Sequence, residues 1–175
     1  MEIQLFQGIA QVSLALEMFA IAPAQGAANL TVAQRSLLAG KARWIRAMFE
    51  AGLPVAPTIV ITRAAWTALQ EERTKGEERL RGHWVATLFR LVGKDGVPPQ
   101  LTVRCAVDGL RPGQMPARTG LLPPARESHA VDPRMPLGRA IGDAFESLGA
   151  GDGVVIIQAT ATGEIVRFLS RDAFT

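Results

Sequence analysis

The sequence predicts a domain of mixed α+β class, and three observations support this prediction. Segments with the β-branched or alternating pattern of strands lie between segments with helical periodicity, and the two kinds intermix along the chain. The chain has 175 residues, of which 48% are hydrophobic and 20% charged, a composition typical of a folded globular protein with its own core. Its 17 Gly and 11 Pro residues predict many turns between these segments.

The N-terminal region, residues 1–34, contains no Lys or Arg and is expected to form an apolar extension of the domain. Residues 2–6 alternate polar and apolar side chains and predict a short strand. An apolar helix is expected over residues 10–20. The apolar stretch 8–24 spans only 17 residues and contains Glu17, so no membrane-spanning helix is expected. Docking of this stretch on a protein partner or a second copy of the chain remains an open alternative.

The next elements follow from caps and periodicity. Thr31 is a candidate N-cap of a short helix, and a clear helix is expected over residues 41–51, ending at Gly52. The predicted apolar face of that helix consists of Trp44, Ile45, Met48 and Phe49. The predicted polar face consists of Arg43, Arg46 and Glu50.

The middle of the chain predicts two strands and two helices. Residues 53–57 are extended because of their two prolines, and residues 58–62 are a β-branched run typical of a buried strand. Helices are expected over residues 64–72 and 77–92. A second strand is expected over residues 100–107.

The C-terminal part predicts loops, one helix and a hairpin. A Gly/Pro-rich loop is expected over residues 110–124 and a polar linker over 126–133. An amphipathic helix follows over residues 137–148. The last predicted element is a hairpin of two strands, 154–159 and 165–169.

Charge and reactive side chains exclude several classes of function. The net charge is +3 and no dense basic run is present, so no nucleic-acid binding is expected. The single cysteine, Cys105, excludes an internal disulfide framework. His83 and His129 lack metal-spaced partners, and no metal site is expected. The N-terminus begins Met-Glu instead of carrying the positive charge of a secretory signal, so a cytoplasmic location is expected.

Gly40 and Lys41 are the first candidate for phosphate binding, because they open the helix expected over 41–51. Backbone N–H groups at a helix start favour an anion, and Lys41 adds a full charge. The complete Walker pattern is absent. An exposed lysine at a helix start is the alternative.

Arg104 is the second candidate. It lies near the end of the strand expected over 100–107, before a Gly/Pro-rich loop, where a guanidinium is well placed to bind a phosphate with two hydrogen bonds. The alternative interpretation is a structural salt bridge.

Several short segments resemble the nucleotide-binding domain of the pyruvate phosphate dikinase and phosphoenolpyruvate synthase family. Residues 39–57 resemble that family's Gly-Gly-Lys-Gly, Leu-x-x-Met and Gly-Leu-Pro-Val-Pro-Pro segments, with Lys41 and Met48 matching. Thr102-Val103-Arg104-Cys105-Ala106 resembles its Ser-Val-Arg-Ser-Gly segment, and Pro112-Gly113-Gln114-Met115 follows at the spacing of its Met-Pro-Gly-Met-Met loop. Residues 154–159 and 170–172 are similar to its later Val-Gln and Arg-Asp segments.

The resemblance implies an ATP-grasp-like fold with a mixed, mostly antiparallel sheet and packed helices. Residues 35–175 would then form a shortened nucleotide-binding domain that binds ATP or a related phosphate ligand. In the family, the lysine and arginine matched by Lys41 and Arg104 bind the ATP phosphates. The candidate ligand-binding residues are Gly40, Lys41, Arg104, Gly113, Gln158 and Arg171.

The sequence also departs from that family. Ala39 and Ala42 replace two loop glycines, and Pro116 stands where the family has Asp. The later segment with the magnesium ligands has no counterpart, so Mg²⁺ would need ligands from another chain and autonomous phosphoryl transfer is not expected. Two alternatives remain: a non-catalytic interaction module whose nucleotide site has decayed, and one subunit of a split enzyme.

Overall fold

The computed structural model describes residues 18–23, 29–76, 84, 87, 100–109, 115, 117–123 and 132–160. These residues form a five-stranded antiparallel sheet and four helices with defined bounds, which confirms the α+β prediction. The strands are β1 (Met18–Ala22), β2 (Thr58–Thr62), β3 (Gln100–Val107), β4 (Ala117–Leu121) and β5 (Gly153–Thr160). The helices are α2 (Val32–Ser36), α3 (Gly40–Glu50), α4 (Arg63–Lys75) and α6 (Pro136–Leu148).

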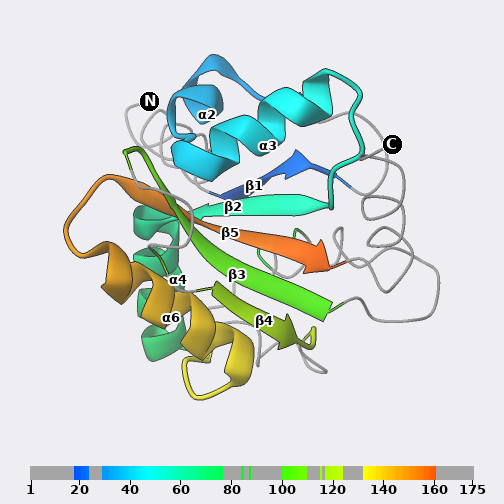
Figure 1. Ribbon diagram of the computed structural model, residues 1–175. Helices are drawn as coiled ribbons and strands as arrows, with labels where there is room; N and C mark the ends of the chain where they lie inside the picture. The colour runs from blue at the N-terminus through cyan, green and yellow to red at the C-terminus, as the bar shows by residue number, and fades with distance from the viewer. Residues whose placement is uncertain are drawn as a thin grey trace, which may run out of the picture.

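The sheet has the strand order β1-β2-β5-β3-β4, with β5 at its centre. β5 pairs with β2 and with β3 in antiparallel registers that continue along both neighbours. Figure 1 shows α4 and α6 on one face of this sheet and α2 and α3 on the other. The described part of the chain therefore has three layers, helices on both sides of a sheet.

The face of the sheet that packs on α4 and α6 carries the larger core. Side chains from β2, β3 and β5 contact Trp66 and Leu69 of α4 and Phe145 of α6. The rings of Trp66 and Phe145 stack, with 6.4 Å between their centroids. The Arg63 guanidinium donates to the carbonyls of Phe145 and Gly149 at the C-terminal end of α6. These contacts hold α4 and α6 together over the sheet.

A second core lies between the sheet and α3. Phe19 and Ile21 of β1, Val60 of β2 and Ile156 of β5 pack there with Ile45 of α3. Because helices cover both faces, every residue of β2 is buried. This explains the continuous β-branched run that predicts the strand.

β1 contradicts part of the helix expected over residues 10–20. Residues 18–20 belong to a strand whose residues Met18 and Phe19 face Ile61 and Val60 of β2. A short apolar run is compatible with a buried helix and a buried strand alike, and the pairing partner decides between them. Most side chains of β1 are buried in this chain, and the rest of the stretch considered for docking, residues 8–17 and 24, lies outside the described residues.

β4 contradicts the loop expected over residues 110–124. It is an exposed strand that pairs, within the described residues, only with β3, and Gly120 within it has a φ of +71°. An Ala-Arg-Thr-Gly-Leu segment has neither hydrophobic alternation nor a β-branched run. Its strand conformation depends on the pairing with β3.

The packing face of α3 differs from the prediction. Trp44 is 73% exposed and Met48 is 40% exposed, whereas Arg46 is only 6% exposed. Arg46 is buried because it donates to the carbonyl of Ile21 at 3.2 Å and pairs with Glu50 at 2.7 Å. The helix therefore turns Trp44 towards solvent instead of towards the core.

The other predicted elements are either confirmed or lie wholly or largely outside the described residues. The helices expected over 64–72 and 137–148 and the strands expected over 58–62, 100–107 and 154–159 are confirmed. Thr31 caps α2 in a reciprocal pair with Gln34. The elements expected over 2–6 and 165–169 lie outside the described residues. In the helix expected over 77–92, only Trp84 and Thr87 are described, and both are helical.

Candidate functional site

Gly40 brings the start of α3 against the end of β3. Its φ is +44°, and a Cβ at this position would lie 2.3 Å from the carbonyl oxygen of Val107. Only glycine tolerates both the backbone angle and this approach. The contact places the first turn of α3 directly beside β3.

Asp108 occupies the position in front of α3. Its Oδ1 accepts a hydrogen bond from the Gly40 backbone N–H at 2.8 Å, and its Oδ2 accepts one from Arg43 at 3.1 Å. The Gly40 N–H, followed by the charge and hydrogen bond of Arg43, lowers the pKa of the Asp108 carboxyl. The anion at this helix start is thus a side chain of the protein, and sequence reasoning missed it. The available signal was the Asp-Gly turn after the strand expected over 100–107.

Lys41 and Arg104 come together beside this contact. Lys41 lies in the first turn of α3, and Arg104 lies on β3 with Ala106, which packs in the core under α3. Side chains two apart on a strand share a face, so Arg104 also points to the α3 side. Partial burial and then the positive charge of Arg104 lower the pKa of the Lys41 ammonium. The two cations predicted from distant segments therefore share one site.

Arg104 has no counter-charge in the described part of the chain. Its Nε atom is buried and has no hydrogen-bond partner. Within the described ranges, no carboxylate forms a salt bridge with Arg104 or Lys41. The structural salt bridge considered as the alternative for Arg104 is thus not found among these residues. A buried unpartnered donor of a charged group destabilises the fold unless something else supplies an acceptor.

A row of polar side chains crosses the sheet next to Arg104. Thr58, Gln158 and Thr102 lie opposite one another on β2, β5 and β3. Gln158 Nε2 donates to Thr58 Oγ1 at 3.2 Å, and Thr58 and Thr102 are both buried. Gln158 is a diagonal neighbour of Arg104, because Arg104 faces Ile156. The predicted residue Gln158 therefore borders the pair, and the two threonines are site neighbours that the sequence did not single out.

The remaining predicted site residues, Gly113 and Arg171, lie outside the described residues. Their assignment stays a prediction. Of the six candidates, the structure thus describes Gly40, Lys41, Arg104 and Gln158, all at or beside the α3 face of the sheet.

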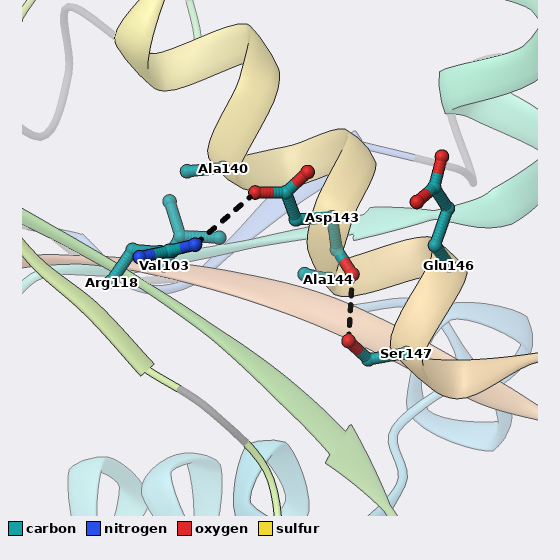
Figure 2. A pocket seen from close by; sticks show the side chains of 7 residues that line it. All are labelled: Val103, Arg118, Ala140, Asp143, Ala144, Glu146 and Ser147. Carbon is teal, nitrogen blue, oxygen red and sulfur yellow. Dashed lines mark hydrogen bonds and ion pairs between the residues drawn. The ribbon is translucent and has the colours of Figure 1, made fainter.

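A pocket lies on the opposite side of the molecule, between α6 and the β3–β4 pair. It has a volume of about 380 Å³ and is lined by Val103, Arg118, Ala140, Asp143, Ala144, Glu146 and Ser147. Figure 2 shows Arg118 and Asp143 pointing at each other. The Arg118 guanidinium and the Asp143 carboxylate lie 3.6 Å apart. Ser147 donates to the Asp143 backbone carbonyl at 2.8 Å. Because Arg118 and Asp143 are paired, this pocket shows no unbalanced cation comparable with Arg104.

The described residues contain no group of three or more His, Cys, Asp or Glu side chains that could hold a metal ion. The Cys105 thiol donates to the Ala144 carbonyl at 3.2 Å, and burial raises its pKa. A thiol with a raised pKa is a poor nucleophile at neutral pH. Among the helices described, none has the length and apolar character needed to cross a membrane.

Comparisons with other proteins give no family for this chain. No family model matches the sequence, and neither a curated protein nor a solved structure matches it.

Proposed function

We propose that this chain binds ATP or a related phosphate ligand at the Lys41–Arg104 pair on the α3 face of the sheet. The observation that carries the proposal is the buried Arg104 Nε without an acceptor, next to a second cation. The resemblance of the Lys41 and Arg104 segments to a dikinase nucleotide-binding domain points to the same ligand class.

The chemistry of the two side chains suits a polyphosphate. A guanidinium donates two parallel hydrogen bonds to phosphate oxygens, and an ammonium supplies a compact charge with rotatable donors. An anion between them would supply an acceptor to the Arg104 Nε and would offset the positive charge of Arg104, which after burial is the second cause of the lowered Lys41 pKa.

The Asp108 carboxylate limits where the phosphates of the ligand can bind. Its carboxylate already accepts from the Gly40 N–H, so a phosphate at the same point would meet a like charge. We therefore assign phosphate binding to the two side chains and not to the start of α3. The proposal covers binding and includes no phosphoryl transfer.

The proposal is tested by calorimetric titration of ATP, with and without Mg²⁺. We expect saturable binding by the wild type, and affinity lower by roughly tenfold or more in Lys41→Ala and Arg104→Met, since each loses a charge-assisted hydrogen bond. Lys75→Ala is the matched control, because it removes the same charge from the exposed end of α4. No heat at millimolar ATP, or equal affinity in Lys41→Ala, would refute the proposal.

A further inference from the structure

We infer that the bound ligand is a nucleoside polyphosphate whose base stacks on the exposed indole of Trp44, one helical turn from Lys41. This inference rests on the proposed function, and it adds which part of the ligand the protein recognises beyond the phosphates. It predicts that the protein distinguishes a nucleotide from an inorganic polyphosphate.

The exposure of Trp44 differs from that of the other tryptophans. The chain has three tryptophans; Trp66 is 9% exposed and Trp84 is 0% exposed, whereas Trp44 is 73% exposed. Tryptophan is enriched at binding interfaces, because its ring offers a large apolar surface for contact. Among the described residues the ring contacts involve Trp66, Phe145 and Phe49, and Trp44 takes part in none of them.

The position of Trp44 on α3 places it beside the cation pair. Trp44 follows Lys41 by three residues, and such residues lie about 5–6 Å apart at their Cβ atoms on one helix surface. Met48 follows at the next turn on the same flank and is also exposed. Arg43 leaves α3 in another direction and pairs with Asp108. The flank of α3 that carries Lys41 therefore continues as an apolar surface of Trp44 and Met48.

A nucleotide fits this arrangement because its charge and its ring lie at opposite ends. Its phosphates would lie at Lys41 and Arg104, and its base would lie over the indole on the same side of the helix. Stacking between a base and an aromatic side chain depends on ring area more than on base identity. We therefore expect purine nucleotides to bind more tightly than pyrimidine nucleotides, with little difference between ATP and GTP.

The test compares ATP with inorganic tripolyphosphate by calorimetry on the wild type, Trp44→Ala and Trp44→Phe. We expect the wild type to bind ATP roughly tenfold more tightly than tripolyphosphate. Such a difference corresponds to the binding free energy contributed by one stacked base. Trp44→Ala should lower the affinity for ATP to that for tripolyphosphate without changing the latter, and Trp44→Phe should retain most of the difference. Leu122→Ala is the matched control, because Leu122 is an apolar residue that is 64% exposed and lies away from α3.

The outcomes separate the two proposals. Equal binding of both ligands by the wild type, with no effect of Trp44→Ala, overturns stacking and leaves phosphate binding intact. If neither ligand binds, the proposed function fails, and the inference fails with it. Fluorescence gives an independent readout, because ATP should quench emission from the exposed tryptophan in the wild type but not in Trp44→Phe. ATP binding without any change in emission would also overturn stacking.

Discussion

The two faces of the sheet carry different side chains on the same strands. Towards α4 and α6, the residues of β5 and its neighbours are apolar, with Val155 and Ile157 fully buried. Towards α3, β5 is apolar at Ile156 and polar two residues later at Gln158. On the first face, the side chains of β2, β3 and β5 pack in the larger core, and the charged groups of Arg118 and Asp143 lie at its border with α6 and β4. The second face combines packing under α3 with a polar region that includes Arg104, whose buried Nε has no partner among the described residues, and the proposed ligand would bind there.

Ile157→Ala should produce the largest loss of stability. Ile157 is fully buried at the centre of the α4–α6 face, and truncating such a side chain costs about 2–5 kcal/mol. Gln158→Ala on the other face should cost about 1 kcal/mol, because it loses one hydrogen bond to Thr58. Urea unfolding of both variants measures the difference, and equal losses would contradict the contrast between the faces.

Gly40→Ala should be the next most damaging change. The new Cβ would meet the Val107 carbonyl at 2.3 Å with φ at +44°, so we expect a loss of roughly 2–4 kcal/mol. Gly52→Ala is the control, because Gly52 has a φ of +73° but no atom within 4 Å of the added Cβ. It should lose about 1 kcal/mol. Thermal unfolding that ranks Gly52→Ala as the more damaging change would show that the α3–β3 approach is not tight.

Arg104→Met should leave stability unchanged within about 0.5 kcal/mol or raise it. The substitution removes a charged group whose Nε has no partner and keeps much of the aliphatic volume. Chemical denaturation in the absence of ligand measures this effect. A loss above about 2 kcal/mol would mean that Arg104 stabilises the fold. Both faces of the sheet would then serve a structural role.

Near neutral pH, the change of ATP affinity with pH should be the smallest of the predicted effects. Burial and Arg104 lower the Lys41 pKa below its ordinary 10.5 in the free protein, and a bound phosphate would raise it again. Affinity is therefore highest while Lys41 is charged and falls, at most tenfold per pH unit, as the pH rises through the free-protein pKa. Titrations between pH 7 and 10 on the wild type and Lys41→Ala check this. The variant should lack the decline.

The regular elements were predictable where one local pattern sufficed. The β-branched run of β2, the alternation in β3 and the amphipathic pattern of α6 each have one satisfactory conformation. β4 was not predictable, because its exposed sequence becomes a strand only through pairing with β3. The predicted packing face of α3 was right for Ile45 and Phe49 and wrong for Trp44 and Met48. Arg46 displaces Trp44 from the core through partners in β1 and at the end of α3, which periodicity does not reveal.

The two cationic side chains of the candidate site could be predicted from the sequence. Their proximity and the polar side chains around them could not. The helix start at Lys41 and the strand end at Arg104 each suggested phosphate binding from residue type and position. Their proximity depends on the close approach at Gly40, and the row of Thr58, Gln158 and Thr102 depends on sheet register. Both are long-range features that a local pattern does not determine.

The central position of β5 has a consequence for the way the chain folds. β5 follows all the other described strands in the sequence but lies between β2 and β3, and the Gln158–Thr58 hydrogen bond joins residues 100 positions apart. Closing such a large loop gives a high contact order and slow folding. Until β5 inserts, β2 and β3 each present an unpaired, largely apolar edge, the kind of surface on which partly folded chains associate. Refolding should therefore give lower yields at higher protein concentration, with insertion of β5 as the slow step.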